Sequence, residues 1–258
     1  MSGARSGDPR AGGGRGGTSG EPSGLAERLR LIVITDRRIA AGAGHTSIVD
    51  VVRAAVAAGA TSIQLRDKDA SARELAEQGR ALLEITRPAG ALLFVNDRVD
   101  VALAVGADGV HVGPDDLPVG AVRRAVEGAG RGSGGGTRGV GPGGSGPAQR
   151  FLIGTSTDDP EEARRLVAEG ADYLGCGTVY ATSSKPDAGS VIGVEGLAAV
   201  VEAVEAPVVG IGGVTAERAA EIRTHTAAAG VAVIGAVMGA RDVDAAVRGL
   251  LAASSAPF

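Results

Sequence analysis

The chain has 258 residues, a length that suits one α/β barrel or two modest domains, and one barrel is the simpler expectation. Its 26 Lys and Arg against 30 Asp and Glu give a formal net charge of -4, so no overall basic field favours nucleic acid or an anionic membrane. Two Tyr, three Phe and no Trp leave few rings to stack on bases. The composition argues against a general nucleic-acid binder and predicts a core of aliphatic side chains.

The chain has one cysteine, Cys176, which cannot form an internal disulfide or supply the several thiolates of a structural zinc site. The first 24 residues contain no apolar run of the kind a signal peptide needs, and nowhere do eighteen uncharged apolar residues follow one another. We therefore expect a soluble protein of the reducing cytoplasm. We expect small-molecule substrates as its partners, and no binding to nucleic acid or to membranes. The sequence leaves open whether the chain forms a homo-oligomer.

Two segments are too rich in Gly, Ser, Arg and Pro to bury a core. Residues 1–28 are expected to be a disordered tail, and residues 128–150 form a second stretch of the same kind. A domain linker and a surface-loop insertion are both compatible with that composition, because loop-closure entropy grows slowly with length. We interpret the second stretch as a flexible insert without chemistry inside one catalytic domain, residues 29–256.

Eight short, largely β-branched runs predict strands, in chain order at 31–35, 62–66, 92–95, 109–112, 151–154, 173–175, 207–211 and 230–234. Segments with helical period separate most of them, among them 48–59, 72–86, 161–170 and 243–253. Strand followed by helix, repeated, indicates a parallel sheet. The fold class expected is therefore α/β, a (β/α)8 TIM barrel in a single domain, with the Gly-rich insert between helix 4 and strand 5.

A weak internal repeat supports closure into a barrel. AAGATSI, AVGADGV, AEGADYL and AAGVAV each end a helix on Gly and enter a strand at once. We expect Gly59, Gly106, Gly170 and Gly230 to close four equivalent turns in left-handed conformation. The insert then lies on the side of the barrel away from the face where active sites form.

The second strand ends in the sequence QLRDK, residues 64–68. Alternation along the strand sends Gln64, Arg66 and Lys68 to one side, so that an amide and two cations would face the barrel mouth. A solvated rim with surface ion pairs is the alternative.

Acidic residues follow the next two strands. LLFVND delivers Asn96 and Asp97 to the mouth, and GVHVGPDD delivers Asp115 and Asp116 into the following loop. Adjacent parallel strands lie about 5 Å apart, so Asp97 and Asp116 can reach one hard cation, and Mg²⁺ normally keeps such an incomplete shell until phosphates add oxygens. Helix caps would also explain both acids. His111 is expected to be a satisfied core histidine.

Hydroxyl groups follow the fifth and sixth strands. Ser156 reads as part of a helix start, and its hydroxyl with nearby backbone N–H groups would also suit a diphosphate. After strand six, Lys185 follows Thr182, Ser183 and Ser184 in a long loop that could close over phosphate oxygens. A disordered loop without function is the alternative.

Glycines follow the seventh and eighth strands, at Gly212, Gly213 and Gly235. They let backbone N–H groups approach an anion where TIM barrels usually bind phosphate, although a tight turn would also explain Gly212. We therefore expect a phosphorylated small-molecule substrate.

In this order, QLRDK, VND, GVHVGPDD, GTS, the TSSK loop, VGIGGV and VIGA resemble the thiamine phosphate synthase (thiamine-phosphate pyrophosphorylase) family, over roughly residues 31–253 without the insert. The resemblance implies a Mg²⁺-dependent transferase of thiamine biosynthesis. Such an enzyme joins hydroxymethylpyrimidine diphosphate to a (carboxy)thiazole phosphate, giving thiamine phosphate and pyrophosphate. The implied mechanism is dissociative, with a pyrimidine methylene cation between loss of pyrophosphate and capture by the thiazole nitrogen.

The resemblance also assigns residue roles. Arg66, Lys68 and Lys185 become the catalytic cations that stabilise the departing diphosphate, and Asp97 and Asp116 become the Mg²⁺ ligands. The implied pyrimidine diphosphate ligands are Gln64, Leu65, Arg66, Asp67, Lys68, Asn96, Ser156 and Lys185. The implied thiazole phosphate ligands are Thr182, Ser183, Ser184, Gly213, Ile234 and Gly235.

The sequence departs from the family pattern at three positions of the matched motifs. Ala181 stands where members commonly have Pro, Ser184 replaces a Thr, and Gly235 stands where many relatives have Ser. A thiazole tautomerase on the same barrel lacks the acid after strand three and uses a His after strand five, whereas here Asp97 is present and Asp158 occupies the place of that His. A non-catalytic ligand-binding barrel is the second rival. The full set of charged positions favours the synthase.

Overall fold

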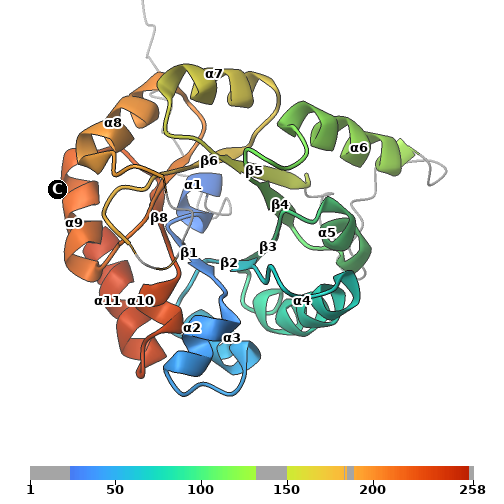
Figure 1. Ribbon diagram of the computed structural model, residues 1–258, viewed down its shortest axis with the longest axis vertical. Coiled ribbons are helices and arrows are strands. Elements are labelled where there is room, and N and C mark those ends of the chain that lie inside the picture. The colour runs from blue at the N-terminus through green and yellow to red at the C-terminus, as the bar shows by residue number, and fades with distance from the viewer. Residues whose placement is uncertain (1–23, 132–149, 183, 185–188, 256–258) are drawn as a thin grey trace, which may run out of the picture.

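The structure, a computed structural model, describes residues 24–131, 150–182, 184 and 189–255. In this part of the chain eight parallel strands close into a barrel in the order β1 to β8, and helices form a ring around it (Figure 1). Each strand is hydrogen-bonded to its sequence neighbours, and β8 pairs with β1. The (β/α)8 TIM barrel expected from the alternation of strands and helices is confirmed.

The strands begin and end within two residues of the expected ranges. They are β1 (Leu31–Ile34), β2 (Ser62–Leu65), β3 (Leu92–Asn96), β4 (Gly109–Val112), β5 (Leu152–Ser156), β6 (Tyr173–Cys176), β7 (Val208–Ile211) and β8 (Gly230–Val233). Their parallel pairing places all eight carboxyl ends at one rim, the barrel mouth. The register sets Asn96 at the end of β3 opposite His111 in β4, which brings the acidic segments after these strands side by side.

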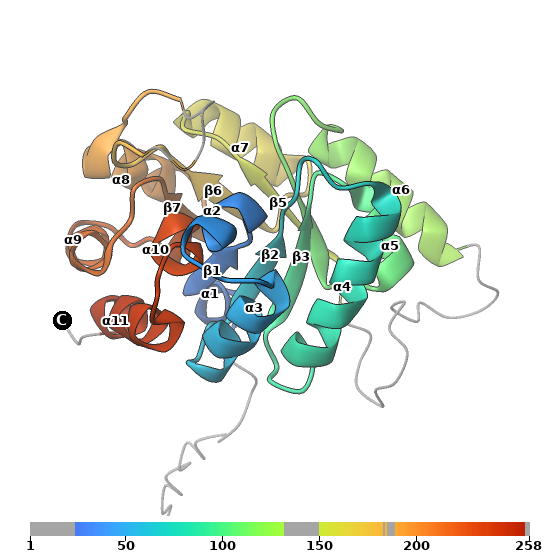
Figure 2. The same ribbon diagram turned by 60° about the horizontal axis from the view of Figure 1, so that its bottom comes forward.

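Helices lie along the outside of the strands, except α1, which lies within the ring of strands in the view of Figure 1 (Figures 1 and 2). They are α1 (Leu25–Arg28), α2 (Arg37–Gly42), α3 (Ile48–Ala57), α4 (Ala72–Thr86), α5 (Val99–Val105), α6 (Val119–Arg131), α7 (Pro160–Ala168), α8 (Gly193–Ala203), α9 (Ala216–His225), α10 (Gly235–Met238) and α11 (Val243–Ser255). The four periodic segments singled out in the sequence correspond to α3, α4, α7 and α11. Their buried faces pack aliphatic side chains on the strands, as the composition predicts.

Side-chain caps fix where several helices begin after the strands. Ser47 caps α3, Ser71 and Glu74 form a reciprocal capping box at α4, Asp159 caps α7 ahead of a proline, and Thr215 caps α9. Each such cap contributes about 1 kcal/mol. Because these caps lie in the loops that follow strands, they also fix the loops that surround the mouth.

Two aromatic rings fill the middle of the barrel, where aliphatic side chains were expected. The ring centres of Phe94 and Tyr173 lie 5.1 Å apart, and both side chains are almost completely buried. Glycines opposite make the room, since a Cβ on Gly154 would lie 2.2 Å from the Tyr173 ring and one on Gly109 would lie 2.9 Å from Phe94. In the barrel interior, the two large rings thus fill the space that the glycines leave free.

Three of the four expected left-handed turns are confirmed, and one is wrong. Gly59, Gly106 and Gly170 have φ of 107°, 73° and 109°. Gly230 instead begins β8 and is absent from the glycines with positive φ in the described chain. Its lack of a side chain has another cause, because a Cβ there would lie 2.4 Å from the Leu29 carbonyl oxygen.

A side-chain acceptor two residues after each of those three glycines joins neighbouring strands. Thr61 accepts from the Leu31 N–H at 3.2 Å, Asp108 from Leu93 at 2.7 Å and Asp172 from Ile153 at 2.7 Å. The repeated Gly-Ala-Thr and Gly-Ala-Asp sequences therefore have the same physical role at the amino-terminal end of the barrel.

The ends of the expected tail and insert differ from the sequence-based boundaries. Helix α1 and the fully buried Leu29 show that ordered structure starts before residue 29, at the amino-terminal end of the barrel, where the Ser62 hydroxyl donates to the Arg28 carbonyl at 2.6 Å. Helix α6 continues to Arg131, three residues past the expected start of the insert at residue 128. Residues 1–23 and 132–149 lie outside the described residues. No helix in the described ranges is long and apolar enough to cross a membrane.

Candidate active site at the barrel mouth

Gln64 and Arg66 lie at the carboxyl end of β2, inside the rim. Gln64 is only 3% exposed. The Arg66 backbone is tied to the Thr35 hydroxyl, which accepts from its N–H at 2.9 Å and donates to its carbonyl at 3.0 Å. The Arg66 guanidinium donates to Asp36 at 3.3 Å. Arg66 is therefore fixed in main chain and side chain by the segment that follows β1.

The other members of QLRDK divide between rim and core. Leu65 is fully buried, and its side chain faces α4, where a Cβ on Gly79 would lie 3.6 Å from it. The Asp67 carboxylate is also buried and lies 3.3 Å from Arg37 Nε, so it is paired beside α2. Lys68 acts electrostatically on Asp97 across the rim. Gln64 and Arg66 thus follow the expected alternation, and Lys68 acts on Asp97 from the loop beyond β2. The side chains of Leu65 and Asp67 are engaged elsewhere.

The two acids from neighbouring strands meet at the mouth. The carboxyl groups of Asp97 and Asp116 are hydrogen-bonded to each other, and Asp116 Oδ2 also accepts from the Gly113 N–H at 2.8 Å. The pKa of Asp97 is raised to about 6, chiefly by burial and next by the neighbouring Asp116, while Lys68 and Arg66 act in the opposite direction. The mouth thus holds two carboxyl groups in contact, with two positively charged side chains near enough to act on Asp97.

The backbone at Asp97 has a conformation that is rare outside glycine. Among the described residues other than glycine, Asp97 alone has a positive φ, 63°. The Arg98 N–H donates to the Asn96 carbonyl at 2.7 Å across this residue, a tight turn over three residues. Such a conformation costs on the order of 1–3 kcal/mol and is typical of functional sites. Helix α5 has no side-chain cap, so the helix-cap alternative is wrong for Asp97.

The Asp97 and Asp116 pair fits a hard divalent cation. Carboxylate oxygens are the ligands that Mg²⁺ prefers, and a pair leaves room for water and phosphate oxygens. In the described part of the chain no group of three or more His, Cys, Asp and Glu side chains forms a complete metal site. Two carboxylates leave the other positions around such an ion to water or to further oxygen ligands.

A chain of hydrogen bonds crosses the barrel below the mouth. Tyr173 is hydrogen-bonded to the Gln64 side chain, and its hydroxyl lies 3.0 Å from His111 Nδ1. His111 Nε2 lies 2.8 Å from the Ser156 hydroxyl. Both ring nitrogens of His111 thus have partners, as expected for a satisfied core histidine, and they connect two residues expected to bind substrate. Tyr173 was not predicted as part of the site, because no local signal in the sequence distinguishes it from any other core aromatic residue.

Loops after β6, β7 and β8 meet on the other side of the mouth. A Cβ on Gly213 would lie 2.5 Å from the Ala181 carbonyl oxygen, and one on Gly235 would lie 2.9 Å from the Ser184 hydroxyl. The Ser184 N–H donates to the Thr182 hydroxyl at 3.2 Å. Residues expected to hold one phosphate from three separate segments are therefore brought together.

The remaining expected site residues are placed as follows. Ile234 is buried and precedes the first turn of α10, and Asn96 ends β3 beside Asp97. Ser183 and Lys185 lie outside the described residues.

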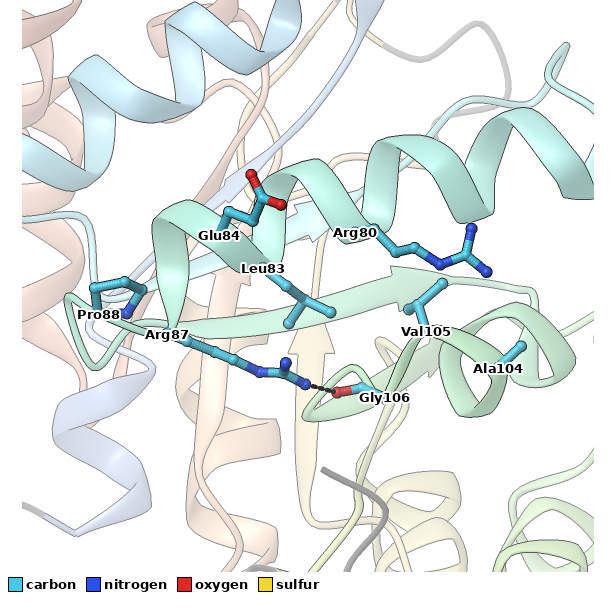
Figure 3. A pocket seen from close by; sticks show the side chains of 8 residues that line it. All are labelled: Arg80, Leu83, Glu84, Arg87, Pro88, Ala104, Val105 and Gly106. Atoms are coloured by element: carbon cyan, nitrogen blue, oxygen red, sulfur yellow. Dashed lines mark hydrogen bonds between the residues drawn. The ribbon is translucent and has the colours of Figure 1, made fainter. Parts of the chain in front are cut away.

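A separate hollow of about 590 Å³ lies on the outer surface, between α4 and α5 (Figure 3). The Arg87 guanidinium donates there to the Gly106 carbonyl at 2.8 Å, at the carboxyl end of α5. This interaction satisfies a helix terminus on the side of the barrel away from the mouth. The hollow is thus distinct from the candidate site.

A closed parallel barrel with acids, cations and glycine-rich loops at its carboxyl rim places the protein in the class of TIM-barrel enzymes. Within that class, a family model described as Thiamine monophosphate synthase matches residues 31–130 and 147–237. The chain belongs to this family. The match passes over residues 131–146, inside the Gly-rich segment.

Curated relatives and a solved structure agree with this membership. The thiamine-phosphate synthase of Roseiflexus castenholzii is 47% identical over 220 residues, covering 85% of this chain and 86% of the relative. The thiamine-phosphate synthase of Pyrococcus furiosus is 44% identical over 219 residues, covering 85% and 91%. The structure of thiamine phosphate pyrophosphorylase from Pyrococcus furiosus superposes with a TM-score of 0.73 at 41% identity, covering 89% of this chain and 97% of that one.

Proposed function

We propose that this chain is a thiamine phosphate synthase. It transfers the pyrimidinylmethyl group of hydroxymethylpyrimidine diphosphate to the nitrogen of a (carboxy)thiazole phosphate, with release of pyrophosphate and, where the thiazole carries a carboxylate, of carbon dioxide. Family membership makes it a transferase of thiamine biosynthesis. The observation that supports the reaction most directly is the contact between Asp97 and Asp116 beside Arg66 and Lys68. Two acids that can hold a divalent cation next to two basic side chains would gather the positive charge that a diphosphate leaving group needs.

The diphosphate site is proposed at this acidic and basic rim. Held by Asp97 and Asp116, Mg²⁺ would neutralise part of the charge on the leaving diphosphate. Arg66 and Lys68 bind diphosphate oxygens and stabilise the negative charge that grows as the carbon–oxygen bond breaks. Lys185 is proposed as a third cation, although it lies outside the described residues. Because Thr35 and Asp36 hold Arg66 in place before the reaction, its charge needs little reorganisation at the transition state.

The pyrimidine is proposed to lie over the barrel interior. Gln64, Asn96 and Ser156 are its polar contacts, and the hydrogen-bonded chain through Tyr173 and His111 holds Gln64 and Ser156 in place. Because these hydrogen bonds lie inside the barrel, each of them restricts the direction of the side chains that it joins. Once the diphosphate departs, the thiazole nitrogen attacks the pyrimidine methylene carbon and forms the new carbon–nitrogen bond.

The thiazole phosphate is proposed to bind where three loops meet. Its ligands are Thr182, Ser183, Ser184, Gly213, Ile234 and Gly235, largely through backbone N–H groups. On the diphosphate side, Leu65 and Asp67 are proposed to contribute through the main chain alone, because their side chains are buried beside α4 and α2.

Substrates and location follow from the same proposal. Both substrates are phosphorylated small molecules, and we place the reaction in the cytoplasm, where a single unpaired cysteine is compatible with reducing conditions. The relatives named here are synthases, so they do not favour the tautomerase or the non-catalytic barrel.

The direct test is turnover by the purified full-length chain. Mixed with both substrates and Mg²⁺, it should form thiamine phosphate, followed by fluorescence after oxidation. Asp97→Asn should lower kcat/KM at least about a hundredfold, because a fixed charge at the leaving group is lost. Asparagine tolerates a positive φ, so folding should be retained.

Asp100→Asn is the matched control. Asp100 lies three residues further on, exposed and paired with Arg98 at 2.6 Å. It should keep wild-type turnover. Absence of product from the wild-type chain with Mg²⁺ would refute the function, whereas product with equal rates for Asp97→Asn and Asp100→Asn would refute the assignment of the acid.

A further inference from the structure

Three side chains form a cluster on the outer side of the rim, where the segment after β6 meets α9. We call Tyr180, Arg218 and Glu221 the Tyr180 cluster. The Tyr180 hydroxyl donates to Glu221 at 2.8 Å, and the Arg218 guanidinium carbon lies 4.7 Å from the centre of the Tyr180 ring. Contact with the ring face restrains the direction of the guanidinium. None of the three is among the expected substrate ligands.

Arg218 also holds the loop after β7. Its Nη1 donates to the Gly213 carbonyl at 2.6 Å, a short and charge-assisted hydrogen bond. Gly212 and Gly213 have φ of 104° and 60°, and the Ala181 carbonyl oxygen occupies the space beside Gly213. Two successive glycines have no side chains to restrict them and many accessible conformations. The conformation of this loop is therefore set by contacts from outside it.

Those contacts determine where the loop's N–H groups point. The Gly212 carbonyl accepts from the Tyr180 N–H at 3.1 Å, and the Gly213 carbonyl accepts from Arg218. In a planar trans peptide the N–H points opposite to the carbonyl. The N–H group of Gly213 is therefore turned away from the Tyr180 backbone, and that of Val214 away from Arg218 on α9. Successive N–H groups on one side of a chain form a concavity that binds anions.

We propose that Arg218 is a positioning residue for the phosphate of the thiazole substrate. By holding the Gly213 carbonyl outward, it keeps the N–H of Val214 directed at the phosphate, and Tyr180 and Glu221 keep the guanidinium in place. This proposal rests on the proposed function for the identity of the phosphate. If Arg218 served only to join α9 to the barrel, its loss would lower the stability of the fold and leave the affinity for the substrate unchanged.

The test compares Arg218→Met, Arg218→Lys and Tyr180→Phe with wild type. Kinetic constants are measured for each substrate with the other saturating, and binding of thiazole phosphate and of inorganic phosphate is measured by calorimetry. Arg218→Met should raise the KM and the Kd of thiazole phosphate about tenfold, the effect of losing roughly one hydrogen bond to the anion. In the same variant, the KM of the pyrimidine diphosphate should change less than about twofold.

Graded variants separate positioning from stability. Arg218→Lys keeps one donor for the Gly213 carbonyl and should recover part of the affinity, and Tyr180→Phe keeps the ring beneath Arg218 and should stay close to wild type. Arg223→Met is the matched control, because Arg223 lies on the same helix and donates to a backbone carbonyl, that of Ala253, at 3.0 Å. It should alter thermal stability without changing the KM of thiazole phosphate.

Each outcome decides the proposal. A thiazole phosphate KM that rises in Arg218→Met and Arg223→Met alike, or in neither, overturns it, as does an equal rise for both substrates. If the wild-type chain makes no thiamine phosphate, the proposed function fails, and calorimetry with inorganic phosphate still tests the loop. Equal phosphate affinity in wild type and Arg218→Met would then overturn the positioning role.

Discussion

The Asp36 carboxylate joins a helix start to a guanidinium at the mouth. One of its oxygens, Oδ2, lies 3.3 Å from Arg66 Nη1, and these two side chains are only 16% and 10% exposed. The other oxygen accepts from the N–H groups of Arg38 and Ile39, each at 3.0 Å, and thereby caps α2. The direction of the Arg66 guanidinium is consequently coupled to the start of a helix that follows a different strand.

Two substitutions at Asp36 should separate the cap from the pairing. Asp36→Ala removes both, and we expect the free energy of unfolding to fall by about 1–2 kcal/mol and kcat/KM to fall about tenfold. Asp36→Asn keeps a good helix cap but replaces a charge-assisted hydrogen bond with a neutral one. It should retain most of the stability and lose a smaller part of kcat/KM. Urea denaturation and steady-state kinetics measure the two effects, and wild-type kinetics in Asp36→Ala would contradict the coupling.

Gly154 should be intolerant of any side chain. Gly154→Ala would place a Cβ 2.2 Å from Cζ of Tyr173, whose ring is fixed beside Phe94 and hydrogen-bonded to His111. We expect a loss of about 3 kcal/mol or more in the free energy of unfolding, because the ring cannot move aside without breaking those contacts.

The matched control for this substitution is Gly120→Ala in α6. There the nearest atom to an added Cβ, on Arg124, lies 3.5 Å away, which is ordinary contact. Alanine in a helix should stabilise the fold by up to about 1 kcal/mol. Urea midpoints for the two variants should therefore shift in opposite directions, and a shared direction would mean that the barrel interior is less tightly filled than the structure indicates.

The buried thiol of Cys176 should make the fold less stable at high pH. Burial, with a contribution from Asp158, raises the pKa of this thiol from 9.0 to about 12. As pH rises through 9.0, the unfolded chain loses its thiol proton while the folded chain keeps it. Stability falls wherever the folded state binds more protons. The thiol should add a slope approaching about 1.4 kcal/mol per pH unit between the two pKa values.

Cys176→Ala isolates this effect from other groups that titrate at high pH. The difference in free energy of unfolding between wild type and variant should be constant below pH 8 and should narrow above pH 9, as measured by urea denaturation at each pH. A thiol reagent at pH 8 should react with wild type only after unfolding. A pH-independent difference, or rapid labelling of the native chain, would contradict the burial of this thiol.

The meeting of Asp97 and Asp116 was predictable because it depends on general geometry. Parallel strands place their carboxyl ends at one rim, and neighbouring strands bring the residues that follow them close together. The same alternation predicts that Gln64 and Arg66 share a side of β2. These inferences need no knowledge of side-chain packing, so the sequence was sufficient for them.

Other features depend on contacts between distant segments and were missed. Tyr173 reaches Gln64 and His111 across the barrel only because Gly154 leaves room for its ring. The pairing of Asp36 with Arg66 requires the loops after β1 and β2 to meet at a particular register. Gly230 was misjudged because a glycine needed for close approach looks the same in sequence as one needed for a turn.

Side-chain contacts hold α6 next to the start of β5, independently of the Gly-rich segment that joins them along the chain. Arg123, on α6, donates to the carbonyls of Phe151 at 3.0 Å and Gly170 at 2.7 Å, and pairs with Asp172 at 2.5 Å. Arg150 adds a second ion pair to Asp172 at 3.2 Å. These contacts hold the entry to β5 next to α6 whatever connects them.

Deleting residues 131–146 should therefore leave the enzyme close to intact. The remaining connection falls within the lengths common between helix and strand, so loop closure should change the free energy of unfolding by less than about 1 kcal/mol. Because the two ends lie away from the mouth, kcat/KM should stay within about threefold of wild type, a change of less than 1 kcal/mol. Arg123→Met should instead lose about 2 kcal/mol or more, since it leaves the Asp172 carboxylate, 9% exposed, short of a partner. A large loss of activity on deletion, with stability unchanged, would mean that the segment contributes to the reaction and that its reading as a spacer is wrong.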